Sequence, residues 1–415
     1  DIKRIAMVST HGYFDPVPVL GRTDTGGQVV YVLELAKALT KKGIIVDIYT
    51  RWFEKDKAQI DPVPEYPNLN VVRIPAGEWK FLPKEYIYDV LPELSKNMIE
   101  LIKKNGWDYD LFHGHYVDGG IVACDVAKSL GKPFYFTAHS LGAWKREQMG
   151  GDPDEMEEKF KFKHRISEEI RLFKTVNAQT VTTILQLEKI NELYDFESEN
   201  IKVINPGVNI HIYKPRGEND PPDDINLPKK YVYCISRMDT NKGHDFLLRA
   251  FNIVKDKVSD VDLVIGGGSK NPKPREQGVI DMINGIIDEC NMRDRVHLLG
   301  YVPDEMMVPY YRNAQLFTLP SLFEPFGLTT QEAMACRTAV IASKYGGIRT
   351  IIENDVNGIL VDPSNTDEFA LAITKVLQDN ELRKKLANEA YKTIINEYSW
   401  DAIAEKNLSF FKEYM

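Results

Sequence analysis

The sequence predicts an α/β protein with two doubly wound, Rossmann-like domains, each built on a parallel sheet. Its 415 residues exceed what one ordinary hydrophobic core organises and favour two domains of about 200 residues each. Short runs of β-branched and aromatic residues alternate with segments of helical periodicity, and this alternation occurs twice. A polar, proline-rich stretch separates the two series.

The first domain is expected over residues 1–213. Apolar residues recur at helical spacing from Val29 to Leu39, and Gly43 follows as a typical C-terminal cap. This helix and the strands predicted on either side of it form a strand–helix–strand unit. The strands are predicted from short apolar runs at residues 4–9, 44–50, 70–74, 111–113, 134–138, 180–184 and 201–205.

The second domain is expected over residues 214–397. Residues 214–224 have little to bury and should link the domains, while a final helix at about 398–415 is free to pack back on the first. Ligands of such folds bind beyond the carboxyl ends of the strands, so we expect both sheets to face one interdomain cleft. The strands are predicted at 231–236, 261–266, 296–301, 316–320, 339–342 and 359–361.

The composition argues against several classes of function. A formal net charge of −9 disfavours general binding to nucleic acid or to anionic lipid, and no apolar run approaches the ~18 residues of a membrane span. The four cysteines contain no C-x-x-C pair, so neither a disulfide framework nor a zinc site is expected. This cysteine usage fits a reducing cytoplasm.

The run Asp24-Thr25-Gly26-Gly27-Gln28 stands directly before the first predicted helix. Paired glycines at a helix start let the backbone approach an anion, and the first N–H groups with the helix dipole attract phosphate. A simple tight turn would use the same glycines. The run is therefore a candidate phosphate-binding segment.

Arg237 and Lys242 lie between a predicted buried strand and the next helix. Two cations at the carboxyl end of a sheet are well placed to hold a diphosphate and stabilise it as it departs. A solvated loop is the alternative interpretation.

Two acids, Glu324 and Glu332, flank a Pro-Phe-Gly turn that opens a helix. A glycosidase pair must flank one bond, and the spacing does not place both acids beside the same carbon, so a grip on sugar or ribose hydroxyls is favoured. The glycines at 266–268 lack the G-x-G-x-x-G spacing and the acidic partner of a dinucleotide site, which argues against a nicotinamide dehydrogenase.

Together these residues resemble retaining glycosyltransferase family 4. The E-x7-E motif from Glu324 to Glu332 follows, in family order, the Gly-Gly-Gln loop, His139 in the Thr-Ala-His-Ser-Leu-Gly run, and Arg237 with Lys242. The resemblance spans essentially the whole chain. It implies the GT-B fold of two facing Rossmann-like domains, a hexosyltransferase activity of the EC 2.4.1 class, and no required metal or other cofactor.

Within the family the chain is similar to the sucrose-phosphate synthase and mannosylfructose-phosphate synthase branch, notably at residues 4–13 and 24–35. The resemblance implies transfer from UDP-glucose to fructose 6-phosphate, giving sucrose 6-phosphate. Use of GDP-mannose, as in a mannosylfructose-phosphate synthase, or another family 4 activity are alternatives. A catalytically silent sugar-nucleotide sensor is the non-enzymatic alternative. The oligomeric state stays open.

The resemblance also implies roles for individual residues. His139 would contact the 6-hydroxyl of the reacting sugar, with its backbone carbonyl facing the developing positive charge. The catalytic set is His139, Arg237, Lys242 and Glu324. The donor set is Gly27, Arg237, Lys242, Glu324, Phe326, Gly327, Leu328 and Glu332. The acceptor set is Gly26, Gln28, Lys84, Lys145 and Arg165.

Residues outside the resemblance also bear on the site. A basic island in this acidic chain, Lys159 to Arg171 with Arg165 inside it, could supply donors that converge on one phosphate dianion.

Cys336-Arg337-Thr338 departs from the small residues and glycine that the family commonly has there. Asp108-Tyr109-Asp110 has a metal-binding form but precedes its strand, at the end where ligands do not gather. His113 and His115 lack a third ligand for a metal.

Overall fold

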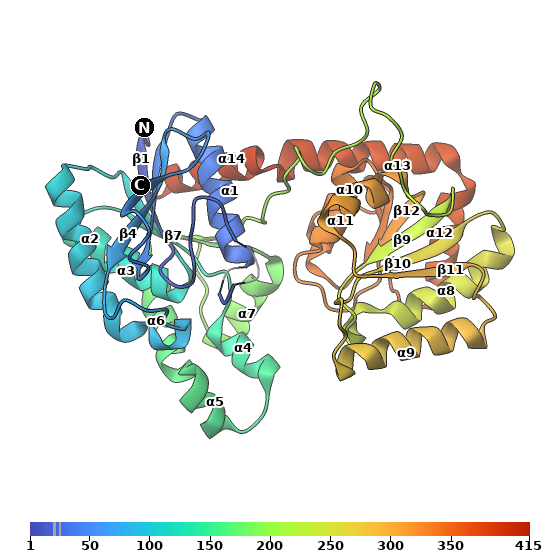
Figure 1. The fold of residues 1–415 in the computed structure, drawn as a ribbon, viewed down its shortest axis with the longest axis horizontal. Coiled ribbons are helices and arrows are strands. Elements are labelled where there is room, and N and C mark those ends of the chain that lie inside the picture. The colour runs from blue at the N-terminus through green and yellow to red at the C-terminus, as the bar shows by residue number, and fades with distance from the viewer. Residues whose placement is uncertain (20–21, 25) are drawn as a thin grey trace. The chain divides into compact units, whose positions relative to one another are not determined.

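The computed structural model of the chain describes residues 1–19, 22–24 and 26–415. It divides into two compact units (Figure 1). The first unit comprises Asp1–Gly207 and Trp400–Met415, and the second comprises Val208–Ser399. The proline-rich segment 214–224 forms no helix or strand and lies within the second unit, where Asp223 accepts hydrogen bonds from Arg312 and Asn313.

The first unit contains a sheet of eight strands in the order β3-β4-β2-β1-β5-β6-β7-β8. All neighbours pair in parallel except β3, an antiparallel edge strand that pattern analysis of the sequence did not predict. The strands are β1 (Arg4–Val8), β2 (Ile45–Trp52), β3 (Ile60–Pro62), β4 (Leu69–Pro75), β5 (Leu111–His115), β6 (Phe134–Thr137), β7 (Ala178–Val181) and β8 (Ile201–Val203).

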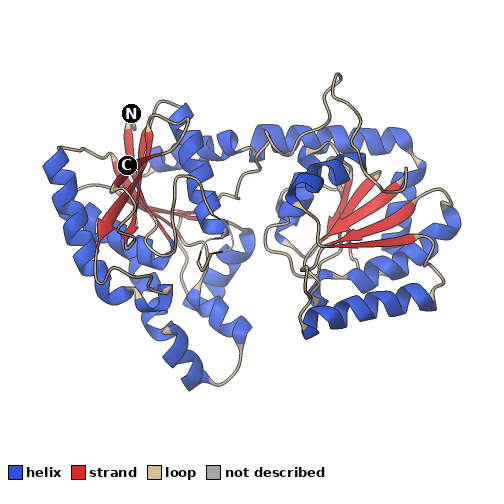
Figure 2. Ribbon diagram, in the orientation of Figure 1, coloured by secondary structure: helices blue, strands red, loops and turns tan. Residues whose placement is uncertain are grey.

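Helices connect the successive parallel strands of this unit, as the alternating pattern predicts, except between β2 and β4, where the chain forms β3 (Figure 2). The last helix of the chain belongs to this unit, where it packs on α1. The helices are α1 (Gly27–Lys41), α2 (Leu91–Asn105), α3 (Tyr116–Leu130), α4 (Gly142–Met149), α5 (Pro153–Phe160), α6 (Phe162–Thr175), α7 (Ile184–Tyr194) and α14 (Trp400–Glu413).

One predicted strand needs correction. The β-branched run 180–184 was predicted as a strand, but β7 ends at Val181 and α7 begins at Ile184. Thr183 is the N-cap, and its hydroxyl accepts a hydrogen bond from the Leu185 N–H at 3.4 Å. Thr183 therefore begins a helix although the residues around it are β-branched, as in a strand.

The second unit contains a sheet of six strands in the order β11-β10-β9-β12-β13-β14, all paired in parallel. The strands are β9 (Tyr231–Ile235), β10 (Asp262–Gly266), β11 (Val296–Gly300), β12 (Leu316–Leu319), β13 (Val340–Ser343) and β14 (Ile359–Val361). The helices are α8 (His244–Lys257), α9 (Pro274–Glu289), α10 (Asp304–Asn313), α11 (Leu328–Ala335), α12 (Thr366–Gln378) and α13 (Asn380–Thr393).

The central strand β9 shows why this sheet is buried on both faces. Val232 and Cys234 pack in the cluster formed with α8, α9 and α12, while Tyr231 and Tyr233 pack in the cluster formed with α10, α11 and α13. Side chains alternate between the faces of a strand, so a strand covered on both sides is apolar throughout. The doubly wound architecture predicted from the sequence is confirmed.

Helix α3 approaches β1 more closely than any side chain would allow. A Cβ atom on Gly119 would lie 2.4 Å from the carbonyl oxygen of Val8. We expect Gly119→Ala to lower the free energy of unfolding by about 1–3 kcal/mol through overpacking. Gly278→Ala in α9 is the control, because nothing lies within 4 Å of its Cβ position.

The control substitution should raise the free energy of unfolding by about 0.5–1 kcal/mol, because alanine stabilises a helix relative to glycine. Urea unfolding followed by far-ultraviolet circular dichroism measures both changes. Equal effects of the two substitutions would contradict the close approach of α3 to β1.

Candidate active site

In the second unit, loops that follow three adjacent strands meet at the carboxyl edge of the sheet. Gly243, at the end of the loop after β9, has a φ of 73°, and a Cβ atom there would lie 2.1 Å from the carbonyl oxygen of Pro320 after β12. Ser321 donates a hydrogen bond to the Asn241 carbonyl at 3.0 Å. The Gly347 N–H, after β13, donates to the Glu324 carbonyl at 2.9 Å. The loops are therefore joined into one platform.

The platform joins a cation and an acid of the predicted donor set. Lys242 Nζ lies 2.7 Å from Glu324 Oε2, and their side chains are 7% and 20% exposed. The second carboxylate oxygen of Glu324 accepts a long hydrogen bond, 3.4 Å, from the Gly327 N–H. The two charges neutralise each other in the present structure, and the partly exposed Glu324 is the side of the pair that a ligand can reach.

The turn between the two acids is shaped for a helix start. Gly327 has a φ of 62° and caps α11, which begins at Leu328. The Phe326 carbonyl accepts a hydrogen bond from the Gln331 side chain at 3.0 Å. Arg237, by contrast, is exposed on the loop after β9. Of the donor residues predicted in this unit, the structure thus places all but Glu332 in these loops or at the start of α11, at one edge of the sheet, with Arg237 toward solvent.

Glu332 lies deeper, on α11. Tyr311 donates a hydrogen bond to its Oε2 at 2.8 Å. Burial raises the pKa of Glu332 to about 7, although hydrogen bonds from Tyr311 and Tyr213 act in the opposite direction. Near neutral pH this acid is therefore partly protonated, and it can both donate and accept hydrogen bonds.

The departure at residues 336–338 lies where α11 ends. Arg337 takes the left-handed conformation with a φ of 60°, the position that glycine favours at a helix end. Its guanidinium lies 4.4 Å from the centre of the Tyr391 ring, and the Thr338 hydroxyl donates to the Tyr311 carbonyl at 2.7 Å. These contacts hold the turn without glycine, and through Tyr311 they connect it to Glu332.

In the first unit, three predicted acceptor residues line one pocket. Lys84 precedes α2, Lys145 is on α4 and Arg165 is on α6. The pocket lining consists of Lys84, Glu85, Tyr88, Tyr116, Lys145, Phe160, Phe162 and Arg165. Burial lowers the pKa of Lys145, and so do the neighbouring charges of Lys84 and Arg165. The cations are thus close enough to repel one another, which favours an anionic ligand.

Arg165 is fixed by the core beneath the pocket. Its side chain is 5% exposed, and its Nε lies 3.0 Å from Glu169, which is 1% exposed. Glu169 also accepts hydrogen bonds from the Gly142 N–H and the Tyr194 hydroxyl. Within the predicted basic island, Lys159 and Lys163 are exposed instead. Among the basic residues of that island, Arg165 is the one that lines the pocket.

The glycine loop before α1 lies beside this pocket without lining it. Gly26 is the N-cap and Gly27 the first residue of α1, as predicted, while Thr25 lies outside the described residues. Gln28 donates to the Ser9 hydroxyl at 3.0 Å. The loop is joined to the pocket through Asp24, whose carboxylate lies 2.6 Å from Lys84 Nζ.

His139 follows β6 in a left-handed conformation with a φ of 57°. Its Nε2 lies 2.9 Å from Nδ1 of His115, and the Tyr31 ring packs edge-on at 4.7 Å. Burial lowers the pKa of His139 to about 3, so the ring is neutral near pH 7. Its backbone carbonyl accepts a hydrogen bond from Gln186 at 2.9 Å.

The motifs with a metal-like appearance have structural roles. Asp110 accepts hydrogen bonds from the N–H groups of Lys3 and Arg4, which fixes the amino end of β1. His113 contacts the Thr137 hydroxyl at 2.7 Å. Across residues 1–19, 22–24 and 26–415, no three His, Cys, Asp or Glu side chains are grouped to hold a metal ion. In the same residues no helix is long and apolar enough to cross a bilayer.

Sequence reasoning missed the aromatic and acidic neighbours of the acceptor residues. Tyr88 and Tyr116 line the pocket, and Glu169 supports Arg165 from below. Tyr116 follows β5 directly and has a φ of 64°. Its place after a central parallel strand is a signal that could have marked it, because ligand-binding residues gather there.

The raised pKa of Glu332 gives a testable pH dependence. The folded chain keeps a proton that an unfolded glutamate, with a pKa of about 4.3, has already released, so the associated stability is complete below that value and is lost as pH rises to about 7. Glu332→Gln removes this loss. We expect its free energy of unfolding, relative to wild type, to rise between about pH 5 and about pH 8 by up to about 3 kcal/mol.

Urea unfolding at the two pH values measures the effect. The exposed Glu381→Gln is the control and should show no difference between them. A pH-independent effect of Glu332→Gln would mean that this carboxyl is ionised throughout the range.

Comparison with known proteins places this architecture in a family. Residues 25–212 match the family model described as Glycosyltransferase Family 4, and residues 215–393 match that of Glycosyl transferases group 1. A mannosylfructose-phosphate synthase of Agrobacterium fabrum is 34% identical, over 98% of this chain and 90% of that protein. A probable sucrose-phosphate synthase of Thermosipho melanesiensis is also 34% identical, over 99% and 96%.

Solved structures agree with the sequence relatives. The sucrose-phosphate synthase of Thermosynechococcus elongatus is 27% identical and aligns with a TM-score of 0.70 over 99% of this chain and 98% of that one. A glycosyltransferase from Rickettsia africae shares the fold, with a TM-score of 0.69 at 20% identity over 100% and 99%. The resemblance predicted from the motifs is confirmed: the chain has the GT-B fold and belongs to glycosyltransferase family 4.

Proposed function

We propose that this glycosyltransferase moves a hexose from a nucleotide sugar to fructose 6-phosphate, and that the favoured donor is UDP-glucose, with sucrose 6-phosphate as product. The observation that carries the proposal is the cationic pocket of the first unit. In a chain of net charge −9, Lys84, Lys145 and Arg165 come from three separate segments to line one small hollow. Such convergence suits the charge-assisted hydrogen bonds of a phosphate dianion.

The lining of the pocket offers apolar contacts beside the cations. Tyr88, Tyr116 and Phe162 provide apolar walls beside the cations, so one end of the ligand meets charge and the other meets aromatic faces. The first unit would therefore hold the acceptor. The names of two relatives, which are synthases of sucrose phosphate and mannosylfructose phosphate, support a phosphorylated product.

In this proposal the second unit holds the donor. Lys242 and Arg237 neutralise the diphosphate, and Glu324 grips sugar hydroxyls after Lys242 has turned toward phosphate. The bond between the anomeric carbon and the phosphate oxygen breaks through an oxocarbenium-like transition state, with the departing charge held by these cations. The acceptor oxygen bonds to the same carbon from the same face, and its proton passes to the leaving phosphate. The anomeric configuration is then retained.

Further residues have proposed places in this scheme. Glu332 would bind the nucleotide ribose, and the N–H groups at Gly327 and Leu328, with the N-terminus at Gly27, would face anionic oxygens. A neutral His139 would contact the donor sugar, since its lowered pKa prevents a second positive charge beside an oxocarbenium ion. We also propose a cytoplasmic location, which the four unpaired cysteines support.

GDP-mannose is the second candidate donor, and the similarity to a mannosylfructose-phosphate synthase favours it. A panel of both donors against fructose 6-phosphate and fructose tests the proposal, with product mass and nucleotide release as readouts. We expect UDP release and a hexosyl-fructose phosphate only when UDP-glucose meets the phosphorylated acceptor. Turnover with GDP-mannose alone would reassign the donor, and no turnover with fructose 6-phosphate would refute the acceptor.

Removing one pocket cation should affect the acceptor selectively. We expect Lys145→Met to raise the KM for fructose 6-phosphate about 10- to 100-fold, because one charge-assisted hydrogen bond to phosphate is lost. The KM for the donor should change little. Steady-state kinetics at saturating donor measure this.

Lys163→Met is the matched control, since Lys163 belongs to the same basic island but is exposed outside the pocket lining. It should leave both constants near wild type. Equal effects of the two variants would indicate a general loss of surface charge and would contradict the assigned role of Lys145.

A further inference from the structure

We propose that Asp24 is an internal stand-in for the acceptor phosphate, which the phosphate displaces from Lys84 when it binds. The proposal rests on the acceptor site proposed above. In the structure described here, Lys84 Nζ contacts Asp24 Oδ1 at 2.6 Å, and the two side chains are 22% and 12% exposed. One cation of the pocket is thus already engaged by a carboxylate from a neighbouring loop.

The backbone is arranged to present this carboxylate. Asp24 has a φ of 55°, a left-handed conformation that is unfavourable for most residues and that aspartate tolerates better than most. Gly12, with a φ of 78°, lies against it: a Cβ atom there would come within 2.2 Å of the Asp24 carbonyl oxygen. The Asp24 side chain therefore reaches Lys84 from a backbone position that its neighbours constrain.

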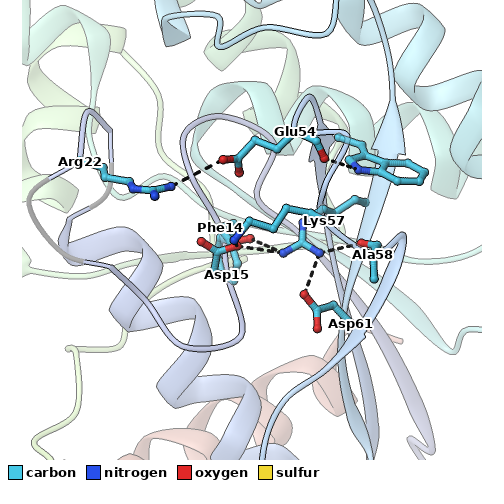
Figure 3. A network of polar contacts seen from close by, with 9 residues as sticks. Phe14, Asp15, Arg22, Glu54, Lys57, Ala58 and Asp61 are labelled. Carbon is cyan, nitrogen blue, oxygen red and sulfur yellow. Dashed lines mark hydrogen bonds and ion pairs between the residues drawn. The ribbon is translucent and has the colours of Figure 1, made fainter.

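The preceding part of the loop is tied to the sheet (Figure 3). Arg73 on β4 lies 3.0 Å from Asp15 and 2.9 Å from Asp61, and it also donates to the Ala58 carbonyl at 2.7 Å. Further along, Arg22 pairs with Glu54 at 3.7 Å. These contacts anchor the chain on both sides of residue 20, so Asp24 can yield to a ligand while its loop stays attached.

Electrostatics favour the exchange. Burial and then the charges of Lys84 and Arg165 lower the pKa of Lys145, whereas Glu85 and Asp24 act in the opposite direction. Asp24 thus offsets part of the repulsion among the pocket cations with a single negative charge. A phosphate dianion brings about two charges and three acceptor oxygens, and so replaces that carboxylate with a stronger partner.

The exchange gives a basis for selectivity. An unphosphorylated sugar offers no anion, so it cannot take the place of Asp24, and the pocket stays neutralised by the protein's own carboxylate. A phosphorylated sugar breaks the Asp24–Lys84 pair and releases the Asp24 carboxylate, while the loop stays attached. Acceptor binding and the contact of the Asp24 side chain are therefore coupled.

Asp24→Asn tests this directly, because asparagine keeps the shape and the tolerance for a left-handed backbone but removes the charge. Isothermal titration of the full chain with inorganic phosphate, and separately with fructose 6-phosphate, gives the dissociation constants. We expect Asp24→Asn to bind both ligands about 5-fold more tightly than wild type, the scale of one partly exposed ion pair. Asp24→Gly, checked by circular dichroism for folding, should shift binding in the same direction.

Glu85→Gln is the matched control. Glu85 also faces Lys84, but at 3.7 Å, and it should change affinity less than Asp24→Asn does. If wild type binds phosphate and the Asp24 variants bind it equally or more weakly, Asp24 only positions Lys84 and the displacement idea is overturned. If wild type binds neither ligand, the acceptor site itself is refuted, and the inference with it.

Discussion

Charge neutralisation inside the protein is the constraint on which the candidate site depends. A cation removed from water without a partner costs several kcal/mol, and two of the pocket cations, Arg165 and Lys84, each meet a carboxylate in the structure. Arg165 pairs with Glu169, and this carboxylate also accepts hydrogen bonds from two other buried groups, so the pair is part of the core. Lys84 pairs with Asp24, on a loop at the pocket margin. The Arg165–Glu169 pair is a fixed part of the pocket wall, whereas in the Lys84–Asp24 pair a ligand can replace the carboxylate.

The second unit meets the same constraint with Lys242 and Glu324, which pair at 2.7 Å. The pair can exist only because the loops after β9 and β12 touch, and Gly243 permits that contact by lacking a Cβ atom. The electrostatic pair thus depends on close backbone packing, which brings the opposite charges together. The charges then determine what the edge of the sheet can bind.

Much of the fold could be predicted from the sequence because parallel strands covered on both faces are short, continuous apolar runs. The exceptions have local causes. The edge strand β3 is three residues long and contains Asp61 and Pro62, so it carries no apolar pattern. The predicted strand at 180–184 overran β7, because Thr183 caps the next helix within a run that stays β-branched.

By itself the sequence determined the two α/β sheets, the family motifs and the positions of the glycines and cations, because these follow from local periodicity and from residue types at fixed spacing. Only the tertiary structure decided which cation pairs with which acid. Lys84 and Asp24 are 60 residues apart, and Lys242 and Glu324 are 82 apart. Their pairing depends on strand order and loop packing, and no spacing along the chain encodes the distance between loops that a sheet brings together.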